Sequence, residues 1–408
     1  MPPTPATAQS VLAIDGGAPV RTAPFPAWPQ FSQDEVAACS AVLASGKVNY
    51  WTGDEGRKFE KEFAASLGRK YAVALANGSV TLELSLRALG VDSGEEVIVP
   101  SRSFIASASC VAVAGARPVF ADCDCDSGNL TAELIAPRIA ARTKAIIVVH
   151  LAGWPCEMDA IMELARERGL KVIEDCAQAQ GAAYRGRPVG SFADAAIFSF
   201  CQDKIMTTGG EGGMLVTDNE KLFHAAWSYK DHGKDFAAAQ QQESGRSFRW
   251  LHRGIGTNWR MTEMQAAMGR AMLPKISERV RARQRNAAIL HAAFSQIPAL
   301  RVPEPGPEIS HAYYRFYAYM RPERLAEGWT RDRILAAIEA EGVPCLSGSC
   351  SEIYREEAFA GMRPRQYFAN ARELGETSLA FLVHPTLGER EMRDTTAAVA
   401  KVMKFAAT

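Results

Sequence analysis

Lys204 and Asp175 have the side chains and the positions that a covalent cofactor requires. Lys204 follows the apolar run Ala195–Phe200, and Asp175 stands 29 residues before it, after the run that starts at Lys171. The amine of a lysine can form a Schiff base with the aldehyde of pyridoxal phosphate (PLP). A carboxylate can keep the pyridine nitrogen of PLP protonated, so that the ring accepts electrons. The pair therefore predicts PLP chemistry.

Two turns at the ends of other predicted strands could hold the rest of such a cofactor. Ligands bind at the carboxyl ends of strands in open α/β sheets. Asn77-Gly78-Ser79 opens a helix, so its N–H groups could bind a phosphate, although such turns are more often only helix caps. Phe104, after the run Glu96–Val99, could stack on a flat ring or could be a core residue at a helix start.

Asp175 and Lys204 each have another explanation when taken alone. An acid that ends a buried strand needs a partner, which could be a structural salt bridge or a helix N-terminus. A lone lysine is nearly always a surface residue. Ser199 near Lys204, Gln178 near Asp175 and the glycine-rich turn Gly209–Gly213 favour a binding site instead.

Seven short apolar runs alternate with helical patterns between residues 70 and 217. The expected strands are Lys70–Ala76, Glu96–Val99, Pro118–Ala121, Ala145–His150, Lys171–Glu174, Ala195–Phe200 and Gly213–Thr217. The expected helices between them are Thr81–Leu89, Ser103–Ala114 and Met158–Gly169. Nearly continuous apolar character is typical of a sheet covered on both faces. The pattern predicts an α/β fold with a mainly parallel seven-stranded sheet.

An arm and a capped helix precede this sheet. Pro24–Phe31 is rich in proline and aromatic residues, which is typical of an extended segment rather than a core element. A helix is expected from Ser32, as its N-cap, to Ser45, with Gly46 as its end. We therefore expect an N-terminal arm at residues 1–31 and a large domain at residues 32–275.

The last third of the chain predicts a smaller α+β domain at residues 276–408. Met261–Phe294 is charged and helical, and polar residues predict an exposed loop at Asp235–His252. A strand-like run and two helical patterns follow at Tyr313–Met320, Arg331–Glu341 and Glu389–Phe405.

Composition favours small-molecule or subunit partners. Lys plus Arg and Asp plus Glu both number 46, so the net charge is zero and no global field favours nucleic acid or an anionic membrane. Hydrophobic residues make up 47% and charged residues 23%, as in ordinary globular enzymes. No apolar run approaches the roughly 18 residues that span a membrane, and residues 1–21 lack a signal-peptide pattern.

Nine cysteines are scattered without paired zinc spacing, so no metal site is expected. An odd count without a disulfide framework indicates reduced thiols, and hence a cytoplasmic protein.

In their order along the chain, these motifs resemble the DegT/StrS family of PLP-dependent sugar aminotransferases, which have fold type I, the fold of aspartate aminotransferase. The resemblance covers about residues 30 to 275. The matching segments are Asn77-Gly78-Ser79, Pro100–Phe104, His150–Gly153, Glu174–Gln178, Ser199-Phe200 with Lys204, Gly210–Gly213 and Asn258–Ala267.

The resemblance implies a role for each matching residue. Lys204 would carry PLP and shuttle a proton, Asp175 would pair with the pyridine nitrogen, and Phe104 would stack on the ring. The remaining contacts to the ring hydroxyl and the phosphate would come from Gln178, Gly78, Ser79 and Ser199. Asn258 would reach the phosphate of the other subunit's cofactor, which implies a homodimer with shared active sites. The substrate pocket would be lined by Trp51, His232, His311 and Tyr313.

The sequence departs from the family pattern at a few positions. Ser79 stands where a threonine is usual, and both are hydroxyl donors. Cys201-Gln202-Asp203 precedes Lys204 where many members have His-Pro or similar residues, and Gly209 adds one residue before the glycine turn. Arg102 occupies a position often held by an aromatic or small residue. Because of these departures, the resemblance specifies the substrate less closely than the cofactor.

The implied reaction moves an amino group from glutamate or glutamine to a keto sugar, most simply a nucleotide-linked one, in amino-sugar biosynthesis. A cyclitol ketone of the scyllo-inosose type or an aminohydroxybenzoate precursor is the alternative. The arm segments Gly16–Arg21 and Pro24–Pro29, together with Gln202, are similar to family members that act on these compounds.

Other classes of protein fit less well. Dehydratase relatives replace the Schiff-base lysine with histidine, whereas this chain has Lys204. A nicotinamide dehydrogenase needs a Gly-x-Gly-x-x-Gly turn, which Asn77–Leu82 does not supply. A sensor built on a PLP fold would carry a basic DNA-binding helix, and the chain has no such appendage.

Overall fold

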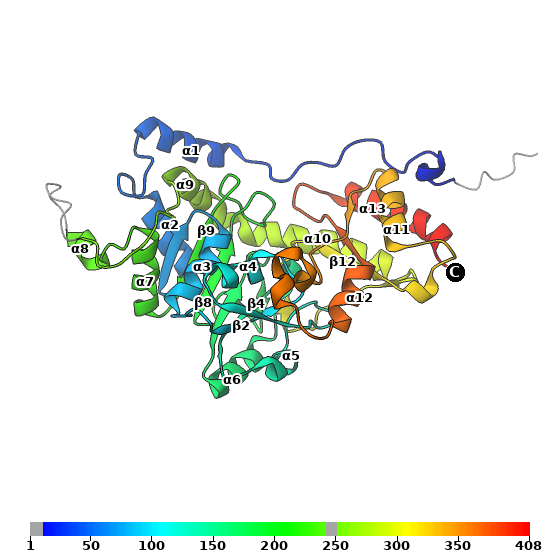
Figure 1. The fold of residues 1–408 in the computed structure, drawn as a ribbon. Helices are drawn as coiled ribbons and strands as arrows, with labels where there is room; N and C mark the ends of the chain where they lie inside the picture. Colours follow the sequence, from blue (N-terminus) through cyan, green and yellow to red (C-terminus); the bar gives the residue numbers. More distant parts are fainter. Residues whose placement is uncertain (1–10, 242–250) are drawn as a thin grey trace, which may run out of the picture.

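A seven-stranded sheet forms the centre of the computed structural model, which describes residues 11–241 and 251–408 (Figure 1). Its strand order is β1-β9-β8-β5-β4-β2-β3. The strands are β1 (Tyr71–Leu75), β2 (Glu96–Pro100), β3 (Arg117–Ala121), β4 (Thr143–Val149), β5 (Lys171–Asp175), β8 (Ala195–Ser199) and β9 (Gly213–Thr217). Only β9 is antiparallel to its neighbours in this sheet. The expected mainly parallel sheet is confirmed, and every strand lies within two residues of its predicted bounds.

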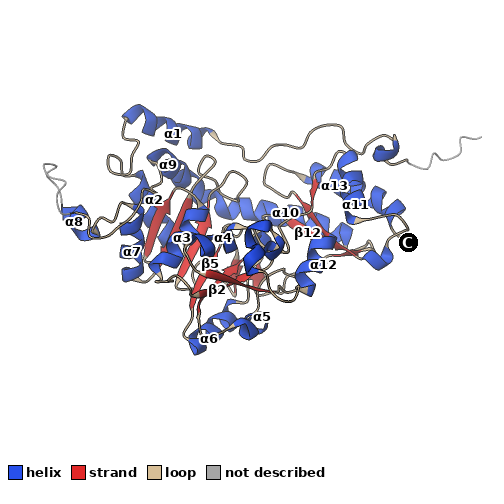
Figure 2. Ribbon diagram, viewed as in Figure 1, coloured by secondary structure: helices blue, strands red, loops and turns tan. Residues whose placement is uncertain are grey.

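Thirteen α-helices are present in the described residues, and they surround the sheets (Figure 2). They are α1 (Gln33–Ser45), α2 (Glu55–Ser66), α3 (Gly78–Ala88), α4 (Ala106–Val113), α5 (Ala132–Ile135), α6 (Met158–Arg168), α7 (Glu220–Lys230), α8 (Phe236–Gln241), α9 (Glu263–Met272), α10 (Ile276–Phe294), α11 (Arg331–Ala340), α12 (Ala369–Thr377) and α13 (Glu389–Ala406).

Alternate residues of each central strand face opposite sides of the sheet, and both sides are buried. On one side, Ile173 of β5 and Ile197 of β8 pack in a core with α3 and α4. On the other side, Val172 packs with α6, and Phe198 packs with α2 and α9. The same alternation sends the side chains of Glu174 and Asp175 to opposite faces of β5.

The expected helix after Ser32 is confirmed, and local hydrogen bonding explains its ends. The Ser32 N–H donates to the Glu35 carboxylate at 2.9 Å, which satisfies a donor at the start of α1. Gly46 has φ of 68°, a left-handed conformation that glycine adopts without strain, and it ends the helix.

Two smaller sheets complete the fold. Strands β10 (Leu300–Arg301), β12 (Phe316–Met320), β14 (Ser378–Phe381) and β13 (Cys345–Leu346) form an antiparallel sheet in that order. Strands β11 (Ile309–Ser310), β6 (Ala183–Tyr184) and β7 (Arg187–Pro188) form the third sheet. The expected smaller α+β part is therefore present.

Helix α10 packs on both parts of the molecule. Val280 belongs to the core beside the central sheet, whereas Leu290 and Phe294 belong to the core of the four-stranded sheet. We propose residues 32–275 and 276–408 as the two domains, with α10 as the helix that they share.

The prediction of an exposed loop at Asp235–His252 was only partly correct. Helix α8 begins at Phe236, whose ring packs edge-on against Trp227 at 4.9 Å and stacks on His224 at 5.0 Å. These tertiary contacts fix a short helix that the polar local sequence did not predict. Residues 242–250 of the expected loop lie outside the described residues.

The N-terminal segment packs against the C-terminal elements. It runs from beside α11 and α13 across the molecule to α1 (Figure 1). Leu12 is buried in the core of the four-stranded sheet. The buried Glu341 carboxylate accepts the N–H groups of Ala13 at 2.8 Å and Val20 at 3.0 Å and pairs with Lys401 at 2.8 Å. Residues 24–31 form no helix or strand, as predicted for an extended arm.

The structure also bears on the expectations about membrane-spanning segments and cysteines. Across residues 11–241 and 251–408, no helix is both long and apolar enough to cross a membrane. All nine cysteines are free thiols.

Candidate active site

A cavity of about 700 Å³ opens where β1, β2, β5 and β8 end. It brings together seven of the residues that the sequence predicted for a cofactor site. They are Gly78, Ser79, Phe104, Asp175, Gln178, Ser199 and Lys204. Its far wall comes from the four-stranded sheet and its loops, through Tyr314, Tyr317 and Cys350. The cavity therefore lies between the two sheets.

Asp175 is a buried carboxylate without a cation. It is 4% exposed, and it accepts hydrogen bonds from the Ser107 hydroxyl at 3.0 Å and the Ala177 N–H at 3.1 Å. Burial raises the pKa of Asp175, although these two donors and Lys204 oppose the rise. It forms no ion pair within the described part of the chain. A protonated ring nitrogen in the cavity would supply the missing cation.

Lys204 lies across the cavity in a shielded position. Its side chain is 14% exposed. Its Nζ atom lies 3.5 Å from the Tyr314 hydroxyl, 3.8 Å from the Asp203 carboxylate and 4.7 Å from the centre of the Tyr314 ring. The indole N–H of Trp28, from the N-terminal arm, donates to the Lys204 carbonyl at 3.0 Å. Both the amine and the backbone of this lysine are thus positioned by distant parts of the chain.

The turn that opens α3 forms a cradle suited to a phosphate. The Asn77 side chain accepts the Val80 N–H at 3.0 Å and so fixes the start of the helix. A Cβ atom at Gly78 would lie only 2.7 Å from the Ser199 Cβ, so only glycine fits here without a shift. The positive end of the helix dipole and the hydroxyls of Ser79 and Ser199 meet at this wall.

Phe104 and Gln178 complete the walls of the cavity. The Phe104 ring is 63% exposed in the single chain, so a flat group could cover it. The Gln178 carbonyl oxygen accepts the Ala152 N–H at 2.7 Å, which orients its side chain. The residues present therefore fit a flat, phosphorylated cationic ring.

Trp51, His232 and Asn258 lie together outside this cavity. Asp231, which the sequence analysis missed, connects these residues. Its carboxylate accepts a hydrogen bond from the Trp51 indole N–H at 3.0 Å, and its backbone forms an isolated β-bridge with Asn258. Arg260 approaches the same carboxylate at 2.9 Å. His232 follows Asp231 with φ of 61°, a strained conformation for a side-chain-bearing residue. The cluster around Asp231 contributes nothing to the cavity of its own chain.

His311 and Tyr313 also face away from the cavity. Their rings stack at 3.8 Å and line a separate hollow of about 600 Å³ beside the third sheet. Burial lowers the pKa of His311 to about 3, so its imidazole is neutral. Tyr313 has φ of 49°, and this turn directs the next residue, Tyr314, into the cavity instead.

The sequence analysis did not identify several residues that contact Asp175 or the surroundings of the Lys204 amine. Asp203 accepts a short hydrogen bond from the Tyr314 hydroxyl and lies 3.4 Å from the Arg315 guanidinium. Burial would raise the pKa of Asp203, but Lys204 and Tyr314 outweigh it, so its carboxylate stays charged. The only feature of the sequence that pointed to Asp203 was the departure of residues 201–203 from the family pattern. Ser107, which holds Asp175, lies inside α4 and gave no signal.

Glu174 anchors the scaffold on the opposite face of β5. It is fully buried and accepts the N–H groups of Gly190 at 2.7 Å, Phe192 at 2.8 Å and Ala193 at 2.9 Å. His150 donates to it at 3.2 Å. Burial alone would raise the pKa of Glu174, but these hydrogen bonds outweigh burial and lower it. The carboxylate therefore ties the loop before β8 to β5, next to Asp175.

His150, Glu174 and Cys176 have ligand atoms within 4.8 Å of one another, a spacing that metal sites share. The His150 Nδ1 atom, however, accepts the Cys156 N–H at 2.9 Å, and its other nitrogen bonds Glu174. Both ring nitrogens are thus occupied, and the group is explained as a structural network.

Comparisons with known proteins find similar sequences and structures over most of the chain. The model of the DegT/DnrJ/EryC1/StrS aminotransferase family matches residues 29–400. An aminotransferase structure from Psychrobacter cryohalolentis is 50% identical with a TM-score of 0.91, over 93% of this chain and 99% of that one. GDP-perosamine synthase from Caulobacter vibrioides is 40% identical over 72% of this chain and 76% of its own. The L-glutamine:2-deoxy-scyllo-inosose aminotransferase of Streptomyces fradiae is 35% identical over 81% of this chain and 79% of its own.

Glu174→Gln is expected to lower the free energy of unfolding at pH 7 by about 2–3 kcal/mol, because an amide NH₂ would face backbone donors. The folded-state pKa of Glu174 is lowered from its usual 4.5, so its stabilisation is present above that pH and is lost as the pH falls below it. Urea unfolding should therefore show a difference between the two proteins that shrinks toward acid pH. Glu167→Gln, an exposed change on α6, is the control and should have almost no effect. An undiminished difference at low pH would contradict this role.

Proposed function

Because this chain belongs to the DegT/DnrJ/EryC1/StrS aminotransferase family, we propose that it transfers an amino group from glutamate or glutamine to a nucleotide-linked keto sugar. Members of the family are PLP-dependent, and we propose PLP as the cofactor here. One observation carries the proposal: Lys204 and the cation-free Asp175 line the same cavity. A cavity with both an amine and an unpaired buried acid suits this chemistry better than simple binding.

PLP, when bound, supplies an aldehyde that condenses with amines and a ring that withdraws electrons from the carbon next to nitrogen. Lys204 would hold it covalently, and Asp175 would keep its ring nitrogen charged. The start of α3, with Gly78, Ser79 and Ser199, would bind the phosphate. The exposed Phe104 ring would cover one face of the cofactor, and Gln178 would orient its hydroxyl.

Tyr314 and Asp203 would control the proton that Lys204 must release and return. The Lys204 amine donates to the Tyr314 hydroxyl, and this hydroxyl donates in turn to Asp203. Burial raises the pKa of Tyr314, so its hydroxyl keeps its proton and passes on the hydrogen bond. The Asp203 carboxylate also lies 3.8 Å from the Lys204 Nζ atom. Tyr314 thus acts as a positioning residue at the Lys204 Nζ atom.

The nucleotide-linked acceptor is supported by relatives such as the GDP-perosamine synthase, which matches most of this chain. The cavity is large enough for a sugar beside the cofactor, and Arg315 adds a cation to its wall. Glu211 and Asp203 give the same wall hydrogen-bond acceptors for hydroxyl groups.

A cyclitol ketone is the second candidate acceptor. The 35% identity to the scyllo-inosose aminotransferase of Streptomyces fradiae favours it. An aminohydroxybenzoate-type precursor belongs with this alternative. The two classes are separated by offering a nucleotide-linked 4-keto sugar and scyllo-inosose to the same protein and comparing kcat/KM.

We infer further that the protein is a homodimer whose subunits share active sites. The cluster of Trp51, His232 and Asn258 around Asp231 serves no group in its own chain's cavity. The exposed Phe104 ring leaves that cavity open on one side. A second copy that brings its Asn258 cluster to this opening would explain both observations.

Lys204→Ala should abolish covalent attachment of PLP and reduce transamination at least about 10³-fold. Borohydride reduction followed by mass spectrometry should find the cofactor on Lys204 in the wild type and nowhere in the variant. Asp175→Asn, which removes only charge, should lower kcat by about 10²-fold. The exposed Lys221→Ala is the control and should remain fully active. Full activity of the Lys204 variant would refute the proposed function.

Tyr314→Phe should lower kcat by about 10- to 100-fold with little change in KM, because Lys204 loses its hydrogen-bond partner. Tyr313→Phe removes a hydroxyl from the neighbouring residue outside the cavity and is the matched control. Asp203→Asn should also lower kcat with little change in KM, because the Tyr314 hydroxyl loses the carboxylate that orients it. An unchanged kcat in this variant would show that Asp203 has no part in positioning Tyr314.

Mixed dimers of Lys204→Ala and Asn258→Ala should regain activity, although each variant alone is inactive. Random mixing gives one intact site in about half of the dimers, hence about a quarter of wild-type activity. The measurement is activity after unfolding and refolding the two variants together. Activity no higher than that of the separate variants would contradict shared sites.

A further inference from the structure

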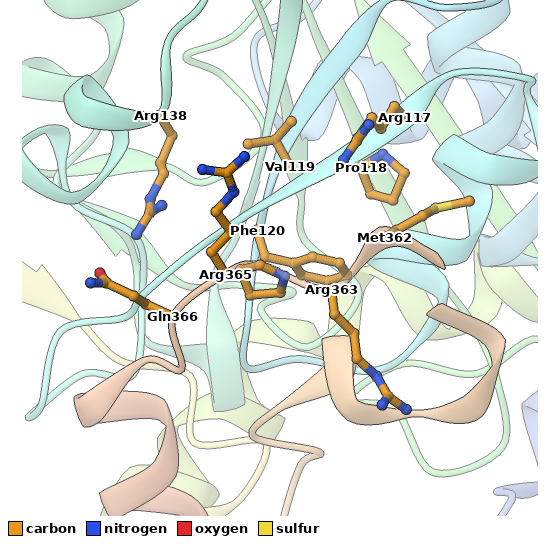
Figure 3. A pocket seen from close by; sticks show the side chains of 10 residues that line it. Arg117, Pro118, Val119, Phe120, Arg138, Met362, Arg363, Arg365 and Gln366 are labelled. Carbon is orange, nitrogen blue, oxygen red and sulfur yellow. The ribbon is translucent and has the colours of Figure 1, made fainter. Parts of the chain in front are cut away.

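A second hollow, of about 400 Å³, lies at the free edge of the central sheet (Figure 3). It shares no lining residue with the Lys204 cavity. Strand β3, which is the last strand in the sheet order, forms its floor, and the segment 362–366 forms its rim. Volumes of this size are typical of small-molecule sites.

The charge of this hollow is one-sided. Four of its ten lining residues are arginines and none is acidic: Arg117, Arg138, Arg363 and Arg365. This concentration is notable because the whole chain has no net charge. Like charges around one hollow repel each other, so an anion between them would stabilise the arrangement.

Most of these guanidinium groups lack an acidic partner. Arg363 lies 3.8 Å from Glu357, and its side chain points to the opposite side of Phe120 from Arg138 and Arg365 (Figure 3). Arg138 lies over the Phe368 ring at 4.8 Å. Neither Arg117 nor Arg365 forms an ion pair with any residue in the ranges 11–241 and 251–408. Arg117, Arg138 and Arg365 therefore line the same hollow without an acidic partner among the described residues.

The edge strand adds a backbone donor. In a parallel ladder, alternate residues turn both backbone groups toward the neighbouring strand. Arg117 donates to Glu95, and Ala121 accepts from Ser101, so both face β2. The N–H of Phe120, between them, faces the outer edge, where the described residues offer it no acceptor.

The floor under these donors is rigid and apolar. Phe120 is 3% exposed and packs edge-on against Tyr354 at 5.8 Å and Phe359 at 5.4 Å. Pro118, Met362 and Pro364 complete this surface. A low-polarity floor strengthens charge pairing above it, since fewer waters compete for the guanidinium groups.

We propose that this hollow binds an oligophosphate, such as the diphosphate of a nucleotide, at a site separate from the active site. A carboxylate accepts only about four hydrogen bonds, whereas each guanidinium group offers up to about five donors in a fork that matches phosphate oxygens. A diphosphate brings more oxygens and about two to three negative charges, which match three unpaired arginines.

The test is calorimetric titration of the PLP-loaded protein with inorganic pyrophosphate, ADP and adenosine. The first variant replaces Arg117, Arg138 and Arg365 with glutamine. A charge-matched control replaces Arg166, Arg372 and Arg393, three arginines paired with glutamates on exposed helix surfaces. Thermal melting of both variants checks their folding.

Pyrophosphate and ADP should bind saturably, and the first variant should weaken both at least tenfold, while the control stays within about twofold of the wild type. Adenosine should not bind there. Equal affinities in the two variants, or adenosine binding as tightly as ADP, would overturn the proposal. Both variants keep the Lys204 cavity, so their difference reports this hollow alone, whether or not the proposed transamination holds.

Discussion

The proposed chemistry depends on a carboxylate that is buried without a cation. Removing Asp175 from water costs free energy, and two hydrogen-bond donors offset only part of that cost. A folded chain retains such a group only where another molecule completes it or where function requires it. The alternation along β5 separates this carboxylate from Glu174, its neighbour in sequence. Glu174 is satisfied by backbone donors and serves the scaffold, whereas Asp175 remains available to a ligand.

The second half of the site depends on contact between two sheets. The Lys204 loop follows β8 of the central sheet, and Tyr314 precedes β12 of the four-stranded sheet. Their hydrogen bond, reinforced through Asp203, makes the orientation of the amine sensitive to how the two sheets pack. Trp28 from the N-terminal arm adds a third anchor on the same loop. The amine and the backbone of Lys204 are thus both held by contacts, which would limit the entropy that a covalent reaction of the amine costs.

The central sheet could be predicted from sequence because its strands are continuous apolar runs, and Gly213–Thr217 matches its predicted bounds at both ends. The positions of Asp175, Lys204 and the Gly78 turn could be predicted because each lies at the end of a strand or in the loop that follows it. It could not be predicted that Tyr314 rather than Tyr313 faces the cavity, because the left-handed backbone at Tyr313 breaks the alternation from which side-chain directions are read. Helix α8 was missed because it depends on packing against Trp227 rather than on local propensity. Asp231 gave no signal, since its partners come from distant segments.

The docking of the first described residues onto the last helices constrains how the chain is made. Ala13 and Val20 bond Glu341, and Ala18 bonds Lys401, across 328, 321 and 383 residues of sequence. On the ribosome, the leading segment therefore emerges long before the surface that receives it. Leu12 must therefore stay unburied until α13 has been synthesised, so the core of the four-stranded sheet can close only after this helix has emerged.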